Sequence, residues 1–519
     1  MKKAIYLIIA LIGLSAPSCS DSMLDFSPTD SGSGKELLKS ASTAITSVNG
    51  VYRSMWTAGW STTANTHQCF GIAAYNLALD CMADDLIMQS QGNGWFWGDH
   101  CYNVKSNYTS SAFRSYDVWY ANYKWIANVN YIIDAEPEMA GTEADVAYVA
   151  GQAYAIRALC YLNLATWFSR APYNSLTGAS RWNEPCVPVY TTGTSIDTGG
   201  QPRESLRTVY GRIDQDIDRA IELLEKARET TLAENNKSHI NLYVALGIKS
   251  RACLAEGDWD GAFKAAKRVI DEGGYAVGTK SDLTGGMNSL DKQNVMWGAG
   301  IQVADQAGGY AGFFTHMDNK EGAYAKSAPK LISKQLYNRI SATDIRRDWW
   351  DPSDKESPYV SKKFSFANVA SFLGDYIYMR VEEMYFTAAE AALRLDDLKN
   401  ARELMNTVMA ERDPGYSANN RSGTLLGATT TTWTGSFLEN ILTHRRIELW
   451  GEYGRLFDVR RLGQGIDRRT DDGFSEECIS MMNRRNVNIT KADTYDWVLT
   501  IPKAELNANP NINEEDQNP

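Results

Sequence analysis

The sequence predicts a mainly α-helical protein built from helical repeats and interrupted by one irregular insertion. Long segments place apolar residues at helical spacing, and two of them resemble each other as helix, acidic turn and helix. Between these two copies, residues 273–378 are rich in Gly, Asn and Ser and alternate with short apolar strands such as 294–301. We therefore expect about four tetratricopeptide-like helix pairs, with a large insertion of loops and short strands, in a single domain over residues 35–519.

The N-terminus has the composition of an export signal. Lys2 and Lys3 precede an apolar run over residues 4–14, which is too short to span a bilayer, and small residues then lead to Cys19. Because this arrangement resembles a bacterial lipoprotein signal, we expect residues 1–18 to be removed and Cys19 to be acylated. An ordinary secretory signal is the alternative. Residues 19–34, rich in Ser, Asp and Gly, would then form a tether.

Four long stretches before the insertion are expected to be helices. They are residues 35–56, 116–135, 143–168 and 206–228. We expect the first to pair with the second, and the third with the fourth. A further apolar run, at 73–88, contains Asp80, Asp84 and Asp85.

The internal repeat joins residues 245–270 to residues 384–409. Relative to the turns at Asp258 and Asp397, the small or branched residues of the two copies fall in register: Ala262 with Ala401, and Val269 with Val408. Small residues at such positions let antiparallel helices approach closely, as in tetratricopeptide units. After the second copy we expect an irregular stretch at 414–435 and a coil at 496–519.

Aromatic residues are abundant, with 15 Trp, 27 Tyr and 15 Phe. Residues 89–107 form a glycine-containing loop that carries Trp95, Phe96 and Trp97 in succession. Loops run over the surface, and three successive large rings cannot all point inward, so at least one is expected to face solvent. A ligand platform and an aromatic lid over the core are both open interpretations.

Several function classes are excluded by the sequence. A net charge of −11 and a pI near 5.2 argue against nucleic-acid binding. None of the five His residues forms a His-x-x-x-His pair, and no Gly-x-Ser-x-Gly elbow or dinucleotide fingerprint occurs. We therefore expect no catalytic residues, no metal and no cofactor. The seven cysteines after Cys19 are scattered, and a disulfide among Cys69, Cys81 and Cys101 remains open.

Residues 445–463 combine five arginines and three carboxylates with large apolar side chains. Interleaving them so tightly forces ions against apolar surface, where they need partners. Glu448, Glu452 and Asp458 lie three or four residues from arginines, so side chains on one helical face could meet. Since no nucleophile, metal set or acid/base pair completes a catalytic site here, we interpret the stretch as an ion-pair network that locks the last repeat helix to the chain that follows.

This stretch also resembles the signature of the SusD/RagB-type outer-membrane lipoproteins of Bacteroidetes. The matching residues are Arg445, Arg446, Ile447, Glu448, Leu449, Glu452, Arg455, Phe457, Asp458, Arg460, Arg461 and Gly463. The sequence departs from the signature at His444, Trp450, Gly451, Tyr453, Leu456 and Leu462, which are mostly packing changes. Weaker matches occur in family order: Asp80, Asp84 and Asp85; Arg157, Ala158 and Tyr161; Gly257, Asp258 and Trp259; Arg380 and Glu383; Ala389, Glu390 and Ala391; Ile501 and Pro502; Gln517, Asn518 and Pro519.

The resemblance implies a surface lipoprotein that binds a nutrient, usually an oligosaccharide, and passes it to a SusC-like TonB-dependent transporter in the outer membrane. In such proteins the sugar stacks on aromatic residues in loops after the paired-Asp helix and in the insertion, which here are residues 93–100 and 310–324. The ligand-binding residues implied are Asn93, Trp95, Trp97, Asp99, Phe313 and Tyr324. An aromatic ring can stack on the C–H face of a pyranose, while Asn93 or Asp99 bonds its hydroxyls. Peptide or glycoprotein cargo, an all-α glycoside hydrolase and a purely structural scaffold are the alternatives.

Overall fold

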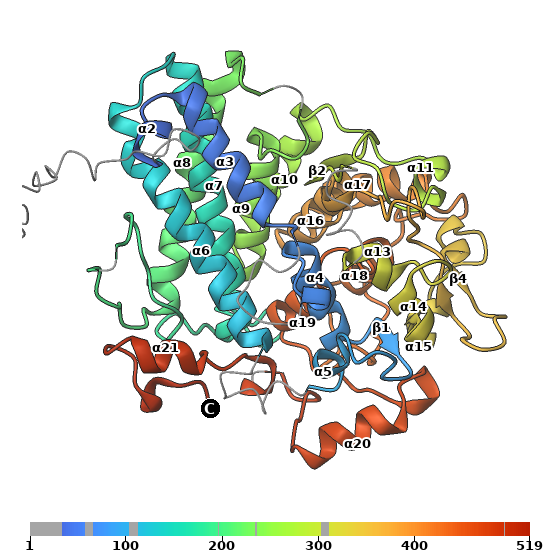
Figure 1. The fold of residues 1–519 in the computed structure, drawn as a ribbon. Helices are drawn as coiled ribbons and strands as arrows, with labels where there is room; N and C mark the ends of the chain where they lie inside the picture. Colours follow the sequence, from blue (N-terminus) through green and yellow to red (C-terminus); the bar gives the residue numbers. More distant parts are fainter. Residues whose placement is uncertain are drawn as a thin grey trace, which may run out of the picture.

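The computed structural model describes residues 34–57, 66–102, 113–195, 197–233, 236–302, 311–492 and 494–519 (Figure 1). The predicted signal peptide, Cys19 and the tether up to residue 33 lie outside these residues, as does Tyr310. In the described ranges, no helix is long and apolar enough to cross a membrane. The structure is mainly α-helical, as predicted.

The first helices form a layered bundle, on the left of Figure 1. They are α2 (Gly34–Leu37), α3 (Ala41–Ser54), α6 (Phe113–Ala135), α7 (Glu143–Phe168) and α8 (Leu206–Lys226). α7 packs against α6 on one side and α8 on the other, and α3 contacts both α6 and α7. The predicted single helix over 35–56 is wrong, because Ser40 takes an extended conformation with φ −139° and pairs with Ala140.

The two repeat copies lie next to each other although the insertion separates them in sequence. They are α9 (Leu242–Glu256) with α10 (Trp259–Glu272), and α16 (Val381–Arg394) with α17 (Leu398–Ala410); α10 packs on α16. In each turn a residue with positive φ precedes an Asp that caps the second helix: Gly257 with Asp258, and Asp396 with Asp397. Ala262 and Ala401 are fully buried, which confirms the predicted close approach.

Two short sheets organise the insertion. β2 (Val295–Ala299) pairs antiparallel with β6 (Tyr376–Arg380), so the two ends of the insertion meet. Trp297 on β2 is 1% exposed, as expected for a core residue. The second sheet has the order β1-β3-β5-β4, from β1 (Leu86–Met88), β3 (Lys330–Ile332), β5 (Val360–Ser361) and β4 (Trp350–Asp351). Since Ile87 faces Leu331 in this sheet, the insertion is joined to the segment that follows the paired aspartates.

Among the described residues, the insertion also carries four short helices, and the chain after the second repeat copy carries four more. The former are α11 (Lys280–Thr284), α13 (Phe313–Met317), α14 (Ala323–Ser327) and α15 (Lys334–Tyr337), and the latter are α18 (Phe437–Glu448), α19 (Arg455–Leu462), α20 (Glu476–Arg484) and α21 (Lys503–Ala508). α18 packs on α16, and α19 packs on α4 (Ile72–Met82). The predicted coil at 496–519 is wrong in part because it contains α21.

Residues 445–463 form the predicted ion-pair network, but most of the partners come from distant elements. Glu448 is fully buried and pairs with Arg346 at 3.0 Å, Arg380 at 3.0 Å and Arg412 at 2.9 Å. Arg346 lies in the insertion, Arg380 ends β6, and Arg412 lies two residues after the end of α17. The ion pairs therefore connect α18 to three other segments of the chain. The expected pairing within one helix occurs at Asp458 and Arg461, whose atoms lie 2.7 Å apart.

Two further groups extend this network. Asp458 also accepts a hydrogen bond from Arg445 at 2.8 Å. Arg461 forms a second ion pair, with Glu390 on α16, at 2.7 Å. Arg446 and Arg455 both contact the carboxylates of Asp84 and Asp85, just before β1. The charge-dense stretch is therefore architectural, and it joins α18 and α19 to α4, α16 and the insertion. All seven cysteines of the described residues are buried free thiols, so the disulfide left open in the sequence is not formed in this structure.

Candidate functional site

The loop between β1 and α5 (Trp97–His100) carries Trp95 to the surface beside α14. The loop can lie this close because residue 92 is glycine. A Cβ at Gly92 would sit 2.7 Å from the Ser327 carbonyl oxygen and 2.8 Å from the Cβ of Ala328, and φ is +50° there. The contact fixes the loop against the insertion, as the predicted site requires.

Trp95 belongs to an aromatic cluster with His67 and Tyr324, here called the Trp95 cluster. The Trp95 ring stacks on the His67 imidazole, with centroids 4.9 Å apart and planes at 20°. Tyr324 presents its edge to both rings, at 5.5 Å from His67 and 6.0 Å from Trp95. The Tyr324 hydroxyl lies 2.6 Å from His67 Nδ1. Trp95 and His67 are partly exposed, whereas Tyr324 is 8% exposed.

A buried second layer supports the Trp95 cluster. His316 on α13 donates from Nε2 to the His67 carbonyl at 2.6 Å, and its ring stacks on Phe70 with centroids 5.6 Å apart. Burial, followed by the charge of Lys330, holds the pKa of His316 well below its usual value, so the imidazole is neutral. His67 is thereby fixed from below by a neutral donor that adds no charge to the cluster.

Phe96 sets the direction of its two tryptophan neighbours. Its φ is 61°, which is rare for a bulky residue and costs conformational energy. The ring is fully buried, 5.0 Å edge-on from His316, and the Phe96 N–H donates to Gln68 Oε1 at 2.8 Å. These contacts hold the strained residue, so the chain turns Trp95 outward and Trp97 inward. The sequence correctly predicts that at least one of the three rings meets solvent.

Asn93 is the exposed polar group nearest to the Trp95 cluster along the loop. Its Oδ1 accepts a hydrogen bond from the Ser327 hydroxyl, which leaves its amide nitrogen without a protein partner in the described part of the chain. That N–H group is free to donate to a ligand oxygen. A stacking ring flanked by an amide donor is an arrangement that suits a hydroxyl-rich, uncharged ligand.

The other three predicted residues lie beneath this surface. Trp97 is 4% exposed, and Asp99 is held by Arg114 in a two-point ion pair with both distances 2.9 Å. Phe313 packs edge-on against Phe364 at 5.1 Å. They offer a ligand almost no surface, so their part in the site is to hold the loop and α13 in place. His67 is absent from the prediction because a lone histidine far along the chain gives no signal.

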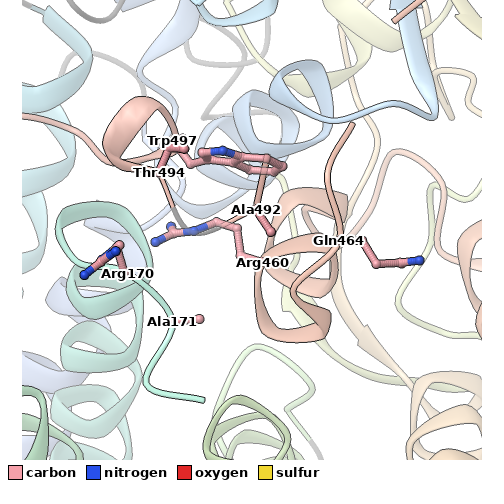
Figure 2. Close-up of a pocket in the computed structure, with 7 residues that line it drawn as sticks. All are labelled: Arg170, Ala171, Arg460, Gln464, Ala492, Thr494 and Trp497. Atoms are coloured by element: carbon pink, nitrogen blue, oxygen red, sulfur yellow. The ribbon is translucent and has the colours of Figure 1, made fainter. Parts of the chain in front are cut away.

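Two other features of the described residues were candidates for binding an ion or a small molecule. No group of three or more His, Cys, Asp or Glu side chains could hold a metal ion within the described ranges. The cavity drawn in Figure 2 lies between Arg170, Arg460 and Trp497 and has a volume of about 10 Å³, room for one water molecule. Arg460 donates there to the carbonyl groups of Thr166 and Ser169 at the end of α7, which is a helix-capping role.

Two family models match the chain, one before the insertion and one from within the insertion to the C-terminus. Residues 326–519 match the SusD family, and residues 43–254 match a family described as starch-binding and associating with the outer membrane. No curated protein matches the sequence.

Solved structures agree with these matches. A SusD-like carbohydrate-binding protein from Bacteroides vulgatus is 25% identical, covers 92% of this chain and 98% of its own, and superposes with a TM-score of 0.72. A SusD superfamily protein from Bacteroides thetaiotaomicron is 22% identical, with coverage of 92% and 100% and a TM-score of 0.73. A surface glycan-binding protein from Bacteroides uniformis, 17% identical with coverage of 92% and 99%, has a TM-score of 0.65. The fold is therefore that of SusD-like helical-repeat proteins, and with the two family matches the chain belongs to the SusD family.

Proposed function

We propose that this protein is a glycan-binding lipoprotein of the cell surface that delivers its ligand, chemically unchanged, to a SusC-like TonB-dependent transporter of the outer membrane. The observation that carries the proposal is the partly exposed Trp95 ring, which His67 and Tyr324 hold in place on the loop that also carries the free amide of Asn93. A preorganised aromatic platform with a polar neighbour binds a sugar ring without paying the entropy of ordering a loop.

The comparisons support the same ligand class. One matching family is described as starch-binding and associating with the outer membrane, and two of the similar structures are named as carbohydrate- or glycan-binding proteins. Lipid attachment at Cys19 and contact with the transporter extend the proposal beyond the described residues.

The deciding experiment is a glycan-array screen of the lipid-free protein, followed by calorimetric titration of the best oligosaccharide with the Trp95→Ala variant. We expect about a tenfold loss of affinity, because truncating a stacked aromatic ring removes about 0.5–1.5 kcal/mol in addition to the apolar area that it buries. Trp182→Ala removes another partly buried tryptophan, packed on Tyr210 at 5.8 Å, and serves as the matched control. Equal affinity in both variants would place the site elsewhere.

Two further measurements separate the alternatives. Binding to a peptide panel and to no glycan would replace the sugar by peptide cargo. Release of reducing ends from a polysaccharide would show a glycoside hydrolase. For the anchor, Cys19→Ser is expected to move the protein from the membrane fraction to the soluble fraction of the cells.

A further inference from the structure

We propose a second saccharide-binding site in an open groove along α6, distinct from the Trp95 cluster. The groove has a volume of about 560 Å³, within the range of about 300–1,000 Å³ that is typical of small-molecule sites. Figure 1 shows α6 and α21 on the left of the molecule, whereas α14 and the insertion lie on the right. The two sites therefore occupy different parts of the surface.

Aromatic side chains line the groove at helical spacing. Tyr120, Tyr123 and Tyr131 lie along one side of α6, and the small side chain of Ala127, between Tyr123 and Tyr131, leaves a hollow. Tyr131 is 45% exposed, more than any other aromatic side chain in the described part of the chain. An outward helix face is normally polar, so a row of tyrosines there indicates a binding surface.

The opposite wall of the groove is the chain segment 188–195, and hydrogen bonds to α6 hold it in place. Asn130 donates to the carbonyl oxygens of Tyr190 and Thr192 at 3.2 and 2.9 Å, and the Tyr123 hydroxyl donates to that of Pro188 at 2.7 Å. The Asp134 carboxylate accepts from the Gly193 N–H at 2.7 Å. Because the protein makes these bonds itself, the wall is formed before a ligand arrives, which lowers the entropy loss on binding.

Unpaired polar groups point to the class of ligand. Within the described residues, neither the Asn128 amide nor the Lys124 ammonium has a hydrogen-bond or ion-pair partner in the protein, and both line the groove. Glu505 also lines the groove, so the lining carries one positive and one negative side chain. Stacking rings, a free amide and balanced charge suit a neutral, hydroxyl-rich molecule better than an anion, so the ligand is a neutral oligosaccharide.

The choice of a saccharide as the ligand rests on the proposed function. The experiment therefore measures binding at the Trp95 cluster and at the groove separately. Hydrogen–deuterium exchange is measured with and without each of maltoheptaose, cellohexaose, xylohexaose and mannohexaose. At least one of them is expected to protect residues 188–195, in the wild type and in Trp95→Ala alike. Asn128→Ala should weaken this protection with roughly a tenfold loss of affinity. Because the Asn128 side chain makes no hydrogen bond with the described part of the protein, this variant is expected to leave the fold intact.

Controls and contrary outcomes follow from the same experiment. Leu395→Ala truncates a side chain that is 43% exposed outside the groove and should change nothing. Protection of the Trp95 loop without protection of 188–195 would overturn the second site and leave the proposed function standing. Protection of 188–195 only after the transporter is added would show a protein contact instead, and no protection at either site by any of the four would overturn both assignments for neutral sugars.

Discussion

Glu448 lies at the centre of a buried network whose charges balance, and neutralising it tests whether that network holds the fold. The four cations are Arg346, Lys363, Arg380 and Arg412, and the four anions are Asp344, Glu382, Glu448 and Glu452. Their side chains are at most 8% exposed. Glu448→Gln keeps the shape of the side chain but leaves one uncompensated positive charge among three guanidinium groups.

The expected loss is large because the remaining charges cannot be hydrated. Removing one partner from a buried ion pair destabilises a protein by about 3–5 kcal/mol. With an unfolding entropy of about 2.1 cal/mol/K per residue, a chain of 519 residues loses roughly one degree of Tm per kcal/mol. Glu448→Gln is therefore expected to lower the Tm by about 3–5 °C at pH 7.

Differential scanning calorimetry over a pH series supplies the assay. Burial alone would raise the pKa of Glu448, but the charges of Arg412, Arg380 and Arg346 hold it well below its usual value of 4.5. The carboxylate thus stabilises the fold fully above pH 4.5, and this contribution is lost as the pH falls toward the folded-state pKa. The difference between wild type and variant should be constant near neutrality and narrow only under acid conditions.

A surface ion pair provides the matched control. Glu272→Gln makes the same substitution in a side chain that is 47% exposed and paired with Arg268, and such pairs contribute about 0–1 kcal/mol. If both variants lowered the Tm equally, or if Glu448→Gln kept its Tm but lost ligand affinity, the network would not be architectural.

Three further predictions address other parts of the molecule. Asp458→Ala should cost about 3–5 kcal/mol while leaving ligand affinity per folded molecule unchanged, because it removes a carboxylate that two buried guanidinium groups, those of Arg445 and Arg461, share; a selective loss of binding would contradict this. Burial raises the pKa of Asp80 from 3.8 to about 8, so folding takes up a proton and wild-type stability should fall relative to Asp80→Asn as the pH rises from 4 to 8; parallel curves in thermal melts would refute the shift. Gly92→Ala should displace the loop and weaken glycan binding, since its Cβ would meet the Ser327 carbonyl, whereas Gly178→Ala, at φ +72° with nothing within 4 Å, should not; equal affinities in titration would oppose this reading.

The helices were predictable because long amphipathic elements repeat their apolar spacing many times. The turns of the repeat were predictable as well, since Asp258 and Asp397 are strong helix caps. Short elements gave too little signal: α20 and α21 have nine and six residues, and their polar composition resembles that of coil. The break at Ser40 depends on pairing with Ala140, which is a tertiary contact that no local pattern contains.

The site was only partly predictable. The loop with Trp95 is visible from its glycines, but its contact with His67 and Tyr324 depends on how the insertion folds back through β1 and β3. The tyrosines at positions 116, 120, 123 and 131 do show helical spacing. The same spacing in a sequence is compatible with a row of side chains facing solvent and with one facing the core. Only the structure shows that Tyr131 is exposed.

The family-like motifs that are scattered along the sequence turn out to be halves of the same buried ion pairs. Arg446 and Arg455 of the signature contact Asp84 and Asp85, and Arg461 contacts Glu390. Replacing one member of a buried ion pair leaves the charge of its partner uncompensated. The motifs that contain the two members therefore have to occur together for the scaffold to be stable. Side chains at the surface, such as Trp95 and Asn93, carry no such constraint. A protein with other residues at those two positions would therefore keep this fold and bind a different ligand, which is why the scaffold identifies the family while the sugar has to be found by binding experiments.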